Sequence, residues 1–227
     1  MATNANKVRT KSSGPKQPLI KAGGYPGRVV QVIDYGLQPQ SYNGEVKDPA
    51  NEIGLTYELV DEFCVAEDGT VQEDKPRWIS ESFPLHSLKA EKAKSTQRYK
   101  ILDPSGKFGG EFLDLINAPC LVNIIENPGK GKNVGKVYNN VATLSLLREK
   151  ELSKLPELKG TPIAFSLDNP DLEVFNSFPD FIQDKIKSNL EFNGSKLQKL
   201  LGGVQKDEHG VAQDDNSQED TSDKTKW

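Results

Sequence analysis

The stretches RVVQVID at residues 28–34 and IGLTYEL at residues 53–59 decide the fold class of this chain. The first is rich in β-branched residues, which favour strands. In the second, apolar residues alternate with Gly, Thr and Glu, which is the period of a strand with one buried face. Both are therefore predicted as strands. Residues 36–51 between them contain prolines and an Asn-Gly pair, and this composition predicts a long, turn-rich connection.

Further strands are expected at residues 77–83, 120–125 and 137–144. Asp68-Gly69 predicts a tight turn before the first of these, because glycine adopts the positive φ that such turns need. Apolar residues recur at helical spacing over residues 85–102, which predicts a helix with a basic outer face. A second short helix is expected at residues 111–116.

The expected order is three strands, a helical segment and two strands. An OB-fold, which is a five-stranded Greek-key barrel, has this order. A small sandwich or another barrel would also accommodate these elements. We expect a mainly β chain with helices (α+β), built as a five-stranded OB-like barrel with a helical insert.

The region after the barrel is predicted to be a C-terminal helical appendage. Residues 168–171, Asp-Asn-Pro-Asp, predict a helix start, because acids are favourable near a helix N-terminus. Ser177 followed by Pro179 predicts the cap and first turn of a second helix. Phenylalanines at helical spacing are expected to pack here, either on the barrel or in a homodimer: Phe175, Phe178 and Phe181.

The two ends of the chain carry opposite charge, although the net charge is only −4. Residues 1–24 contain five basic residues and no acidic one, whereas residues 206–227 contain seven acids and three lysines. Both ends are poor in large apolar residues, which favours disorder. The expected parts are a basic arm, an OB-fold domain, the helical appendage and an acidic tail: residues 1–22, 23–150, 151–202 and 203–227.

Several functional classes are disfavoured by the composition. The sequence contains no run of 18 apolar residues, which a membrane-spanning helix would need. The N-terminus also lacks the apolar core of a secretory signal. We therefore expect a cytoplasmic location. Cys64 and Cys120 are expected to be free thiols. The two cysteines and two histidines are too far apart in sequence to indicate a metal site, and we expect no cofactor. We find no motif that suggests an enzyme.

Residues 127–138, NPGKGKNVGKVY, form the strongest binding feature of the sequence. Glycines let a backbone approach a phosphate closely, and lysines neutralise it. In OB-folds the loop between the fourth and fifth strands is a common nucleic-acid contact. The motif is not a P-loop, because Val137 follows Lys136 where Ser or Thr is required. A solvated basic turn is the alternative interpretation.

Aromatic side chains could stack on bases, which is worth ~1–3 kcal/mol per base. Trp78 is favoured because Ser80 and Ser82 follow it on the same strand face, and Tyr138 because it adjoins the basic hairpin. Packed aromatics and a solvated helix face remain alternatives. The candidate residues for binding single-stranded DNA are Arg77, Trp78, Lys94, Arg98, Lys130, Lys132, Lys136 and Tyr138.

The acidic tail could compete with DNA for the basic groove and contact partner proteins. A merely solubilising tail is the alternative. Lys224 and Lys226 interrupt its acidic character just before the last residue. The candidate contact residues are Asp214, Asp215, Glu219, Asp220, Asp223 and Trp227.

Four segments resemble the single-stranded DNA-binding proteins of tailed bacteriophages: GYPGRVVQVID (24–34), LTYELVD (55–61), PRWIS (76–80) and KVYNN (136–140). The resemblance implies an OB-fold that coats single-stranded DNA during phage DNA replication and recombination in the host cytoplasm. It also implies tail contacts with replication proteins such as polymerase and helicase-primase. One alternative is a phage factor that binds a host or phage RNA polymerase without strong DNA affinity; another is a DNA-processing nuclease.

Overall fold

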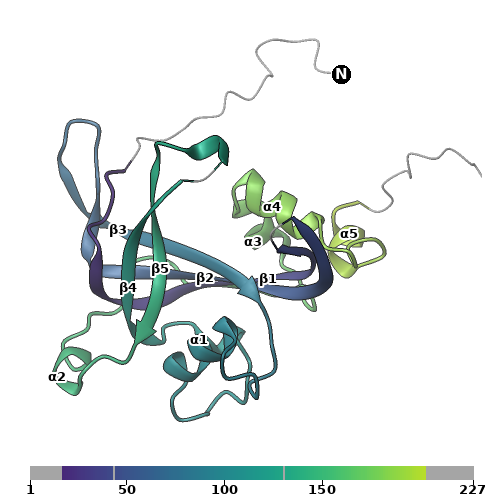
Figure 1. The fold of residues 1–227 in the computed structure, drawn as a ribbon, viewed down its shortest axis with the longest axis horizontal. Coiled ribbons are helices and arrows are strands. Elements are labelled where there is room, and N and C mark those ends of the chain that lie inside the picture. Colours follow the sequence, from purple (N-terminus) through teal and green to yellow (C-terminus); the bar gives the residue numbers. More distant parts are fainter. Residues whose placement is uncertain (1–16, 43, 130, 203–227) are drawn as a thin grey trace, which may run out of the picture.

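The computed structural model describes residues 17–42, 44–129 and 131–202. Its main feature is a curled antiparallel half-barrel of five strands, accompanied by short helices (Figure 1). The strands are β1 (Gly23–Tyr42), β2 (Glu45–Val65), β3 (Val71–Pro84), β4 (Pro119–Pro128) and β5 (Val137–Ser145). The expectation of a mainly β chain with helices is confirmed.

The sheet has the order β3-β2-β1-β4-β5. Long β1 is central: one part pairs with β4 (Gly23↔Ile124), and most of its length pairs with β2 (Gly27↔Leu59). The sheet curls so that its two end strands, β3 and β5, approach each other. The main core is formed by side chains of the five strands that pack together inside the curl: Val29, Val32, Leu55, Tyr57, Leu59, Ile79, Phe83, Cys120, Val122, Ile124, Val141 and Leu144.

The prediction of a long loop at residues 36–51 is wrong, because β1 and β2 continue as one long hairpin. The pairing of the two strands extends as far as Tyr42 and Glu45. Gly44 has φ +84°, which is the backbone conformation that glycine adopts in tight hairpin turns. Pro39 lies at a register shift in the ladder, where a residue without an N–H group breaks no regular pairing.

The other strand predictions are confirmed, with strands longer than expected. Residues 77–83, 120–125 and 137–144 lie inside β3, β4 and β5. The predicted turn between β2 and β3 is present, with Gly69 at φ +86° and the Ala66 N–H donating to the Thr70 carbonyl.

The predicted helix at residues 85–102 is shorter than expected: α1 covers only Lys94–Leu102. Two hydroxyls hold the preceding residues in turns instead, because Ser95 accepts from the His86 N–H and Thr96 donates to the Ser87 carbonyl. Such side-chain bonds to the backbone compete with helix formation. The expected helix at 111–116 is a single 3₁₀ turn, η2 (Leu113–Leu115).

Arg98 of α1 is buried, which corrects the expectation that it belongs to a basic outer face. Its Nε and Nη2 donate to the two carboxylate oxygens of Glu81 on β3, at 2.7 and 3.1 Å. Its Nη2 also donates to the carbonyl oxygens of Val141 and Ala142 on β5, at 3.4 and 3.1 Å. Lys94 adds a second ion pair to Glu81 at 2.7 Å. Arg98 therefore links the two end strands of the sheet.

The pKa of the Glu81 carboxyl reflects this environment. Burial raises it, but the hydrogen bonds and charges of Arg98 and Lys94 lower it further, so the pKa lies below the usual value of 4.5. A carboxyl with a lowered pKa in the fold stabilises the folded state above about pH 4.5 and loses that contribution as the pH falls through its folded pKa.

The remaining elements are α2 (Glu149–Leu152), β6 (Ile163–Phe165), α3 (Leu172–Ser177), α4 (Asp180–Lys187) and α5 (Lys196–Leu200). The sequence did not predict β6, which pairs in parallel with β1. The predicted start of α3 is confirmed, because Asp171 accepts from two backbone N–H groups of its first turn. The predicted cap of the second helix is wrong: Pro179, not Ser177, precedes α4.

A second core lies between β1 and the helices that follow β6. It contains Ile33, Tyr35, Phe165, Phe175, Phe178, Ile186, Phe192 and Leu197. Two of the three phenylalanines expected to pack here are buried, but Phe181 is 72% exposed and does not pack within this chain. Its packing in a homodimer stays a prediction.

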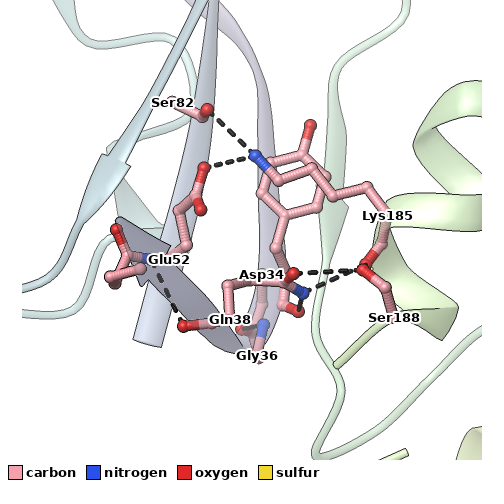
Figure 2. Close-up of polar contacts among 9 residues, drawn as sticks. Asp34, Gly36, Gln38, Glu52, Ser82, Lys185 and Ser188 are labelled. Carbon is pink, nitrogen blue, oxygen red and sulfur yellow. Dashed lines mark hydrogen bonds and ion pairs between the residues drawn. The ribbon is translucent and has the colours of Figure 1, made fainter. Parts of the chain in front are cut away.

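Figure 2 shows how α4 is held against the sheet. Lys185 Nζ donates to the Glu52 carboxylate on β2 and, at 3.1 Å, to the Ser82 hydroxyl on β3, while lying 4.2 Å from the Tyr35 ring centroid. Gln38 of β1 donates to the Lys185 carbonyl at 3.0 Å. Burial, and then the Glu52 charge, raise the pKa of Tyr35 to about 12.

Replacing Arg98 with Ala should lower the free energy of unfolding by about 3–5 kcal/mol, because Glu81 would remain buried without its main partner. Lys100→Ala on the same helix is the control, since Lys100 pairs with Glu91 at the exposed surface, where a pair is worth about 0–1 kcal/mol. Urea unfolding at pH 7 measures both. Equal, small losses for the two variants would contradict a closing role for Arg98.

Candidate nucleic-acid interface

The β4–β5 hairpin extends away from the rest of the barrel (Figure 1). The two strands pair as far as Pro128↔Val137, and the short 3₁₀ turn η3 (Gly131–Asn133) lies at the tip. The Gly129 N–H donates to the Lys136 carbonyl at 2.7 Å. A Cβ on Gly129 would lie 2.2 Å from the Asn133 carbonyl oxygen, so this tight turn requires glycine.

Tyr138 is the exposed aromatic residue of this hairpin, and it lines two hollows. The first, called the segment hollow, has a volume of about 790 Å³ and is lined by Gln17, Pro18, Leu19, Gly135, Lys136, Val137, Tyr138 and Asn139. The second, called the hairpin hollow, has a volume of about 430 Å³ and is lined by Asn127, Pro128, Gly129, Asn133, Tyr138, Asn139 and Asn140. Tyr138 is 41% exposed, so part of its ring is open to a ligand.

The chemistry of the two hollows suits a nucleic-acid strand. Among the described residues, no Asp or Glu side chain lines either of them, so none of these carboxylates would repel a phosphate there. Lys136 supplies positive charge, and its Nζ donates to the Asn133 side-chain oxygen at 3.2 Å. The remaining polar lining side chains are amides, which both donate and accept hydrogen bonds and can therefore pair with base edges.

Gln17, Pro18 and Leu19 form one wall of the segment hollow, and the stretch Gln17–Ile20 is held at both ends. Asn139 Oδ1 accepts from the Ile20 N–H at 2.8 Å, and Asn139 Nδ2 donates to the Ile20 carbonyl at 2.6 Å. At the other end, the Gln17 side chain donates to the Val65 carbonyl at 3.0 Å and accepts from the Val65 N–H at 2.8 Å. Ile20 itself is buried in the main core. The sequence placed these residues in the arm and gave no sign of these contacts.

Trp78 lies elsewhere, on the outer face of β3, and is 42% exposed. Its Nε1 donates at 3.0 Å to Glu58, a buried carboxylate that also accepts from the backbone N–H groups of Lys159 and Gly160. The residue before it, Arg77, is half-buried and points to the opposite face of the strand. Neither Arg77 nor Trp78 lines a hollow beside Tyr138.

The other predicted binding residues divide into two groups. Lys94 and Arg98 both pair with Glu81, and buried Arg98 cannot reach a phosphate without leaving that carboxylate. The structure does not describe the side chain of Lys132. The other predicted residues lie wholly outside the described residues: Lys130, Asp214, Asp215, Glu219, Asp220, Asp223 and Trp227.

The described residues also bear on disulfides, membrane helices and metal sites. Cys64 and Cys120 are free thiols, as predicted. Across the described ranges, no helix has the length and apolar character needed to cross a bilayer, and no three His, Cys, Asp or Glu side chains are grouped to hold a metal ion.

Gly160→Ala should displace the Trp78 ring, because the added Cβ would lie 2.4 Å from a ring carbon and 2.7 Å from a Glu58 oxygen. In a Trp227→Phe background, where Trp78 is the single tryptophan, we expect its emission to shift to the red. Gly23→Ala is the control, since its Cβ would meet the Tyr25 ring at an ordinary 3.6 Å. An unchanged spectrum for Gly160→Ala would contradict the contact.

Searches of protein-family models, of curated proteins and of solved structures find no match to this chain. The function therefore has to follow from the chain's own residues.

Proposed function

We propose that this protein binds single-stranded DNA without sequence preference, through the surface around Tyr138 and Lys136. The observation that carries the proposal is the partly exposed Tyr138 ring, which lies beside two hollows whose described lining contains no carboxylate. Every base has a π-face, so stacking on an exposed ring is tolerant of sequence, and a lysine beside it neutralises the backbone.

The topology supports an OB-like barrel for this function. The sheet order β3-β2-β1-β4-β5, with the end strands approaching each other and α1 between the third and fourth strands, is compatible with that fold. The loop between the last two strands, which is a common nucleic-acid contact in OB-folds, is the hairpin that carries Tyr138. Residues 151–202 are then an appendage whose second core packs on the outer side of β1.

The net charge of −4 on the whole chain does not argue against DNA binding, because the charge near the binding surface matters more. A strand responds to the charges within about a Debye length, roughly 8 Å at physiological salt. Lys136 lies in the lining of the segment hollow, and among the described residues no Asp or Glu side chain lines it.

The biological setting of the proposal rests on the sequence resemblance. It is phage DNA replication and recombination in the host cytoplasm, with the acidic tail contacting polymerase or helicase-primase. The protein would act by coating strands and not as an enzyme.

A second candidate function is a protein contact, such as with an RNA polymerase, without strong DNA affinity. The observation that favours it is Phe181, because a large apolar side chain 72% exposed on α4 is a typical contact residue. Capture of a polymerase by a chain that does not bind oligo(dT) would select this candidate.

Tyr138→Ala should weaken binding to oligo(dT) by about 5- to 150-fold, which corresponds to the loss of one stacked base at ~1–3 kcal/mol. Tyr138→Phe should retain most of the affinity, because stacking needs only the ring. The measurement is a fluorescence-anisotropy titration of labelled oligo(dT) with the full-length chain at low salt.

Tyr42→Ala is the matched control for that titration, since Tyr42 is 68% exposed near the distant β1–β2 turn. Equal losses for Tyr42→Ala and Tyr138→Ala would contradict the proposed surface. Absence of oligo(dT) binding by the parent chain would contradict the function itself.

A further inference from the structure

Another hollow, called the seam cavity, lies between the barrel and the helices that follow β6. Its walls come from β1 and β2, from the residues around the start of η2, from the residues after β6 and from the stretch between α4 and α5. It has a volume of about 580 Å³, which is in the usual range for ligand pockets. It shares no lining residue with the two hollows beside Tyr138.

Gly36 of β1 leaves room in one wall of the seam cavity. Its φ is +71°, and a Cβ there would lie 2.3 Å from Asn189 Nδ2 and 2.7 Å from Leu167 Cδ1. Its N–H donates to Asp34 Oδ1 at 2.8 Å, and Asp34 Oδ2 accepts from the Leu167 N–H at 3.3 Å. Figure 2 shows Asp34 and Gly36 on the stretch of β1 that also meets Lys185 at the end of α4. Glycine therefore lets the Asp34 carboxylate and the Asn189 amide share this wall.

The Asn189 side chain is buried, with 8% exposed, yet only its oxygen is used within the chain. Oδ1 accepts from the backbone N–H groups of Leu37 and Glu191, both at 3.0 Å. Nδ2 has no hydrogen-bond partner among the described residues. Because every fully enclosed side-chain polar atom in that part of the chain has a partner, Nδ2 is open to the seam cavity that Asn189 lines. It is a fixed donor from which a ligand's carbonyl oxygen could accept.

The charged side chains that line the seam cavity are mostly acidic: Asp34, Glu111, Asp168 and Glu191, against Lys196 alone. Lys196 Nζ donates to the Asp168 backbone carbonyl at 2.6 Å, and no described residue forms an ion pair with any of the four carboxylates. Burial is the main cause that raises the pKa of Asp34, and the charges of Asp168 and Glu111 raise it too, while two backbone N–H groups lower it. The cavity therefore attracts a cation.

An organic cation suits this lining better than a metal ion. Across the described ranges, no three His, Cys, Asp or Glu side chains are grouped to hold a metal. A guanidinium has five N–H donors in a planar fork and can reach separated carboxylates. Apolar side chains in the same lining suit the methylene stem of arginine: Ile53, Leu85, Phe112 and Leu113. With the amide donor of Asn189, this chemistry matches an arginine side chain together with a carbonyl of its own peptide.

We propose that the seam cavity binds a basic peptide segment of a partner protein, with an arginine side chain among the carboxylates and a peptide carbonyl accepting from Asn189 Nδ2. The site goes beyond the proposed function and does not rest on it, because it shares no lining residue with the surface around Tyr138. A partner could be held there while a strand occupies that surface.

The test uses N-acetyl-arginine amide, which carries a guanidinium and peptide carbonyls. N-acetyl-citrulline amide keeps the shape and the carbonyls without the charge, and agmatine keeps the guanidinium without the carbonyls. Each probe is titrated into the isotope-labelled full-length chain, and the side-chain amide signals of Asn189 are followed by NMR. These signals are the pair missing from Asn189→Asp, a change that keeps the oxygen accepting from Leu37 and Glu191.

A pair of double variants separates the cavity from charge in general. Glu111→Gln with Asp168→Asn removes two exposed charges from the seam cavity, and glutamine keeps the oxygen that accepts from the Leu113 N–H. This variant should bind the arginine probe about 3- to 30-fold more weakly, as expected for the loss of two exposed charge contacts. The matched control, Glu73→Gln with Asp74→Asn, removes the same charge from exposed positions of β3 outside the cavity and should bind like the parent.

The arginine probe should move the Asn189 amide signals downfield, as a hydrogen bond to a carbonyl does. The citrulline probe should bind about 10-fold more weakly, because its contacts to the carboxylates lack the charge. Agmatine should bind without the downfield shift. Equal losses for the two double variants, equal affinity for the citrulline probe, or no binding of the arginine probe would overturn the site. The same downfield shift with agmatine would overturn the peptide carbonyl contact and with it the assignment to a peptide.

Discussion

The fold depends on the buried ion pair between Glu81 and Arg98. A curled sheet leaves two end strands, here β3 and β5, whose edges would otherwise expose unpaired backbone groups. Arg98 reaches both: its guanidinium meets the Glu81 carboxylate on β3 and two carbonyl oxygens on β5. The Tyr57 hydroxyl donates to Glu81 from β2 at 2.8 Å, so two strands and one helix meet at this carboxylate, and Arg98 links them to β5. Such a pair contributes little net stability, yet it is costly to break because one charge then stays buried alone.

That link also determines where the candidate site lies. By holding β5 against β3 through residues 141 and 142, Arg98 sets the direction of the strand that carries Tyr138. Farther along β5, Asn139 holds Gln17–Ile20, and Ile20 enters the same core. Much of the wall of the segment hollow is therefore fixed to the barrel, through β5 and the tethered stretch Gln17–Ile20, which favours a preorganised surface for a strand.

Much of the sheet could be predicted from sequence, because strand periodicity and glycine turns are local signals. The loop predicted at residues 36–51 failed because prolines were taken as breaks, whereas Pro39 lies where the ladder is irregular. The predicted basic helix face failed at Arg98, since charge patterning assumes that a cation faces solvent. The strand β6 is three residues long and has no pattern of its own. Phe181 has helical spacing with its neighbours, but spacing alone does not say which face is covered.

The candidate site was predictable only in part. Lys136 and Tyr138 were chosen from the hairpin motif, and the structure places them on the same hollow. Trp78 was chosen by the same stacking criterion, and the structure places it on another surface, hydrogen-bonded to Glu58. Gln17 and Asn139 could not be found, because a side-chain amide that pairs with a backbone 48 or 119 residues away leaves no local pattern.

Photocrosslinking to oligo(dT) that carries 5-iodouracil, followed by mass spectrometry of the peptides, tests the location of the strand most directly. We predict that Tyr138 is the main crosslinked residue, with any further crosslinks in the peptide that contains Gln17. Crosslinks confined to Trp78 or to Tyr42, with none in residues 127–140, would contradict the account.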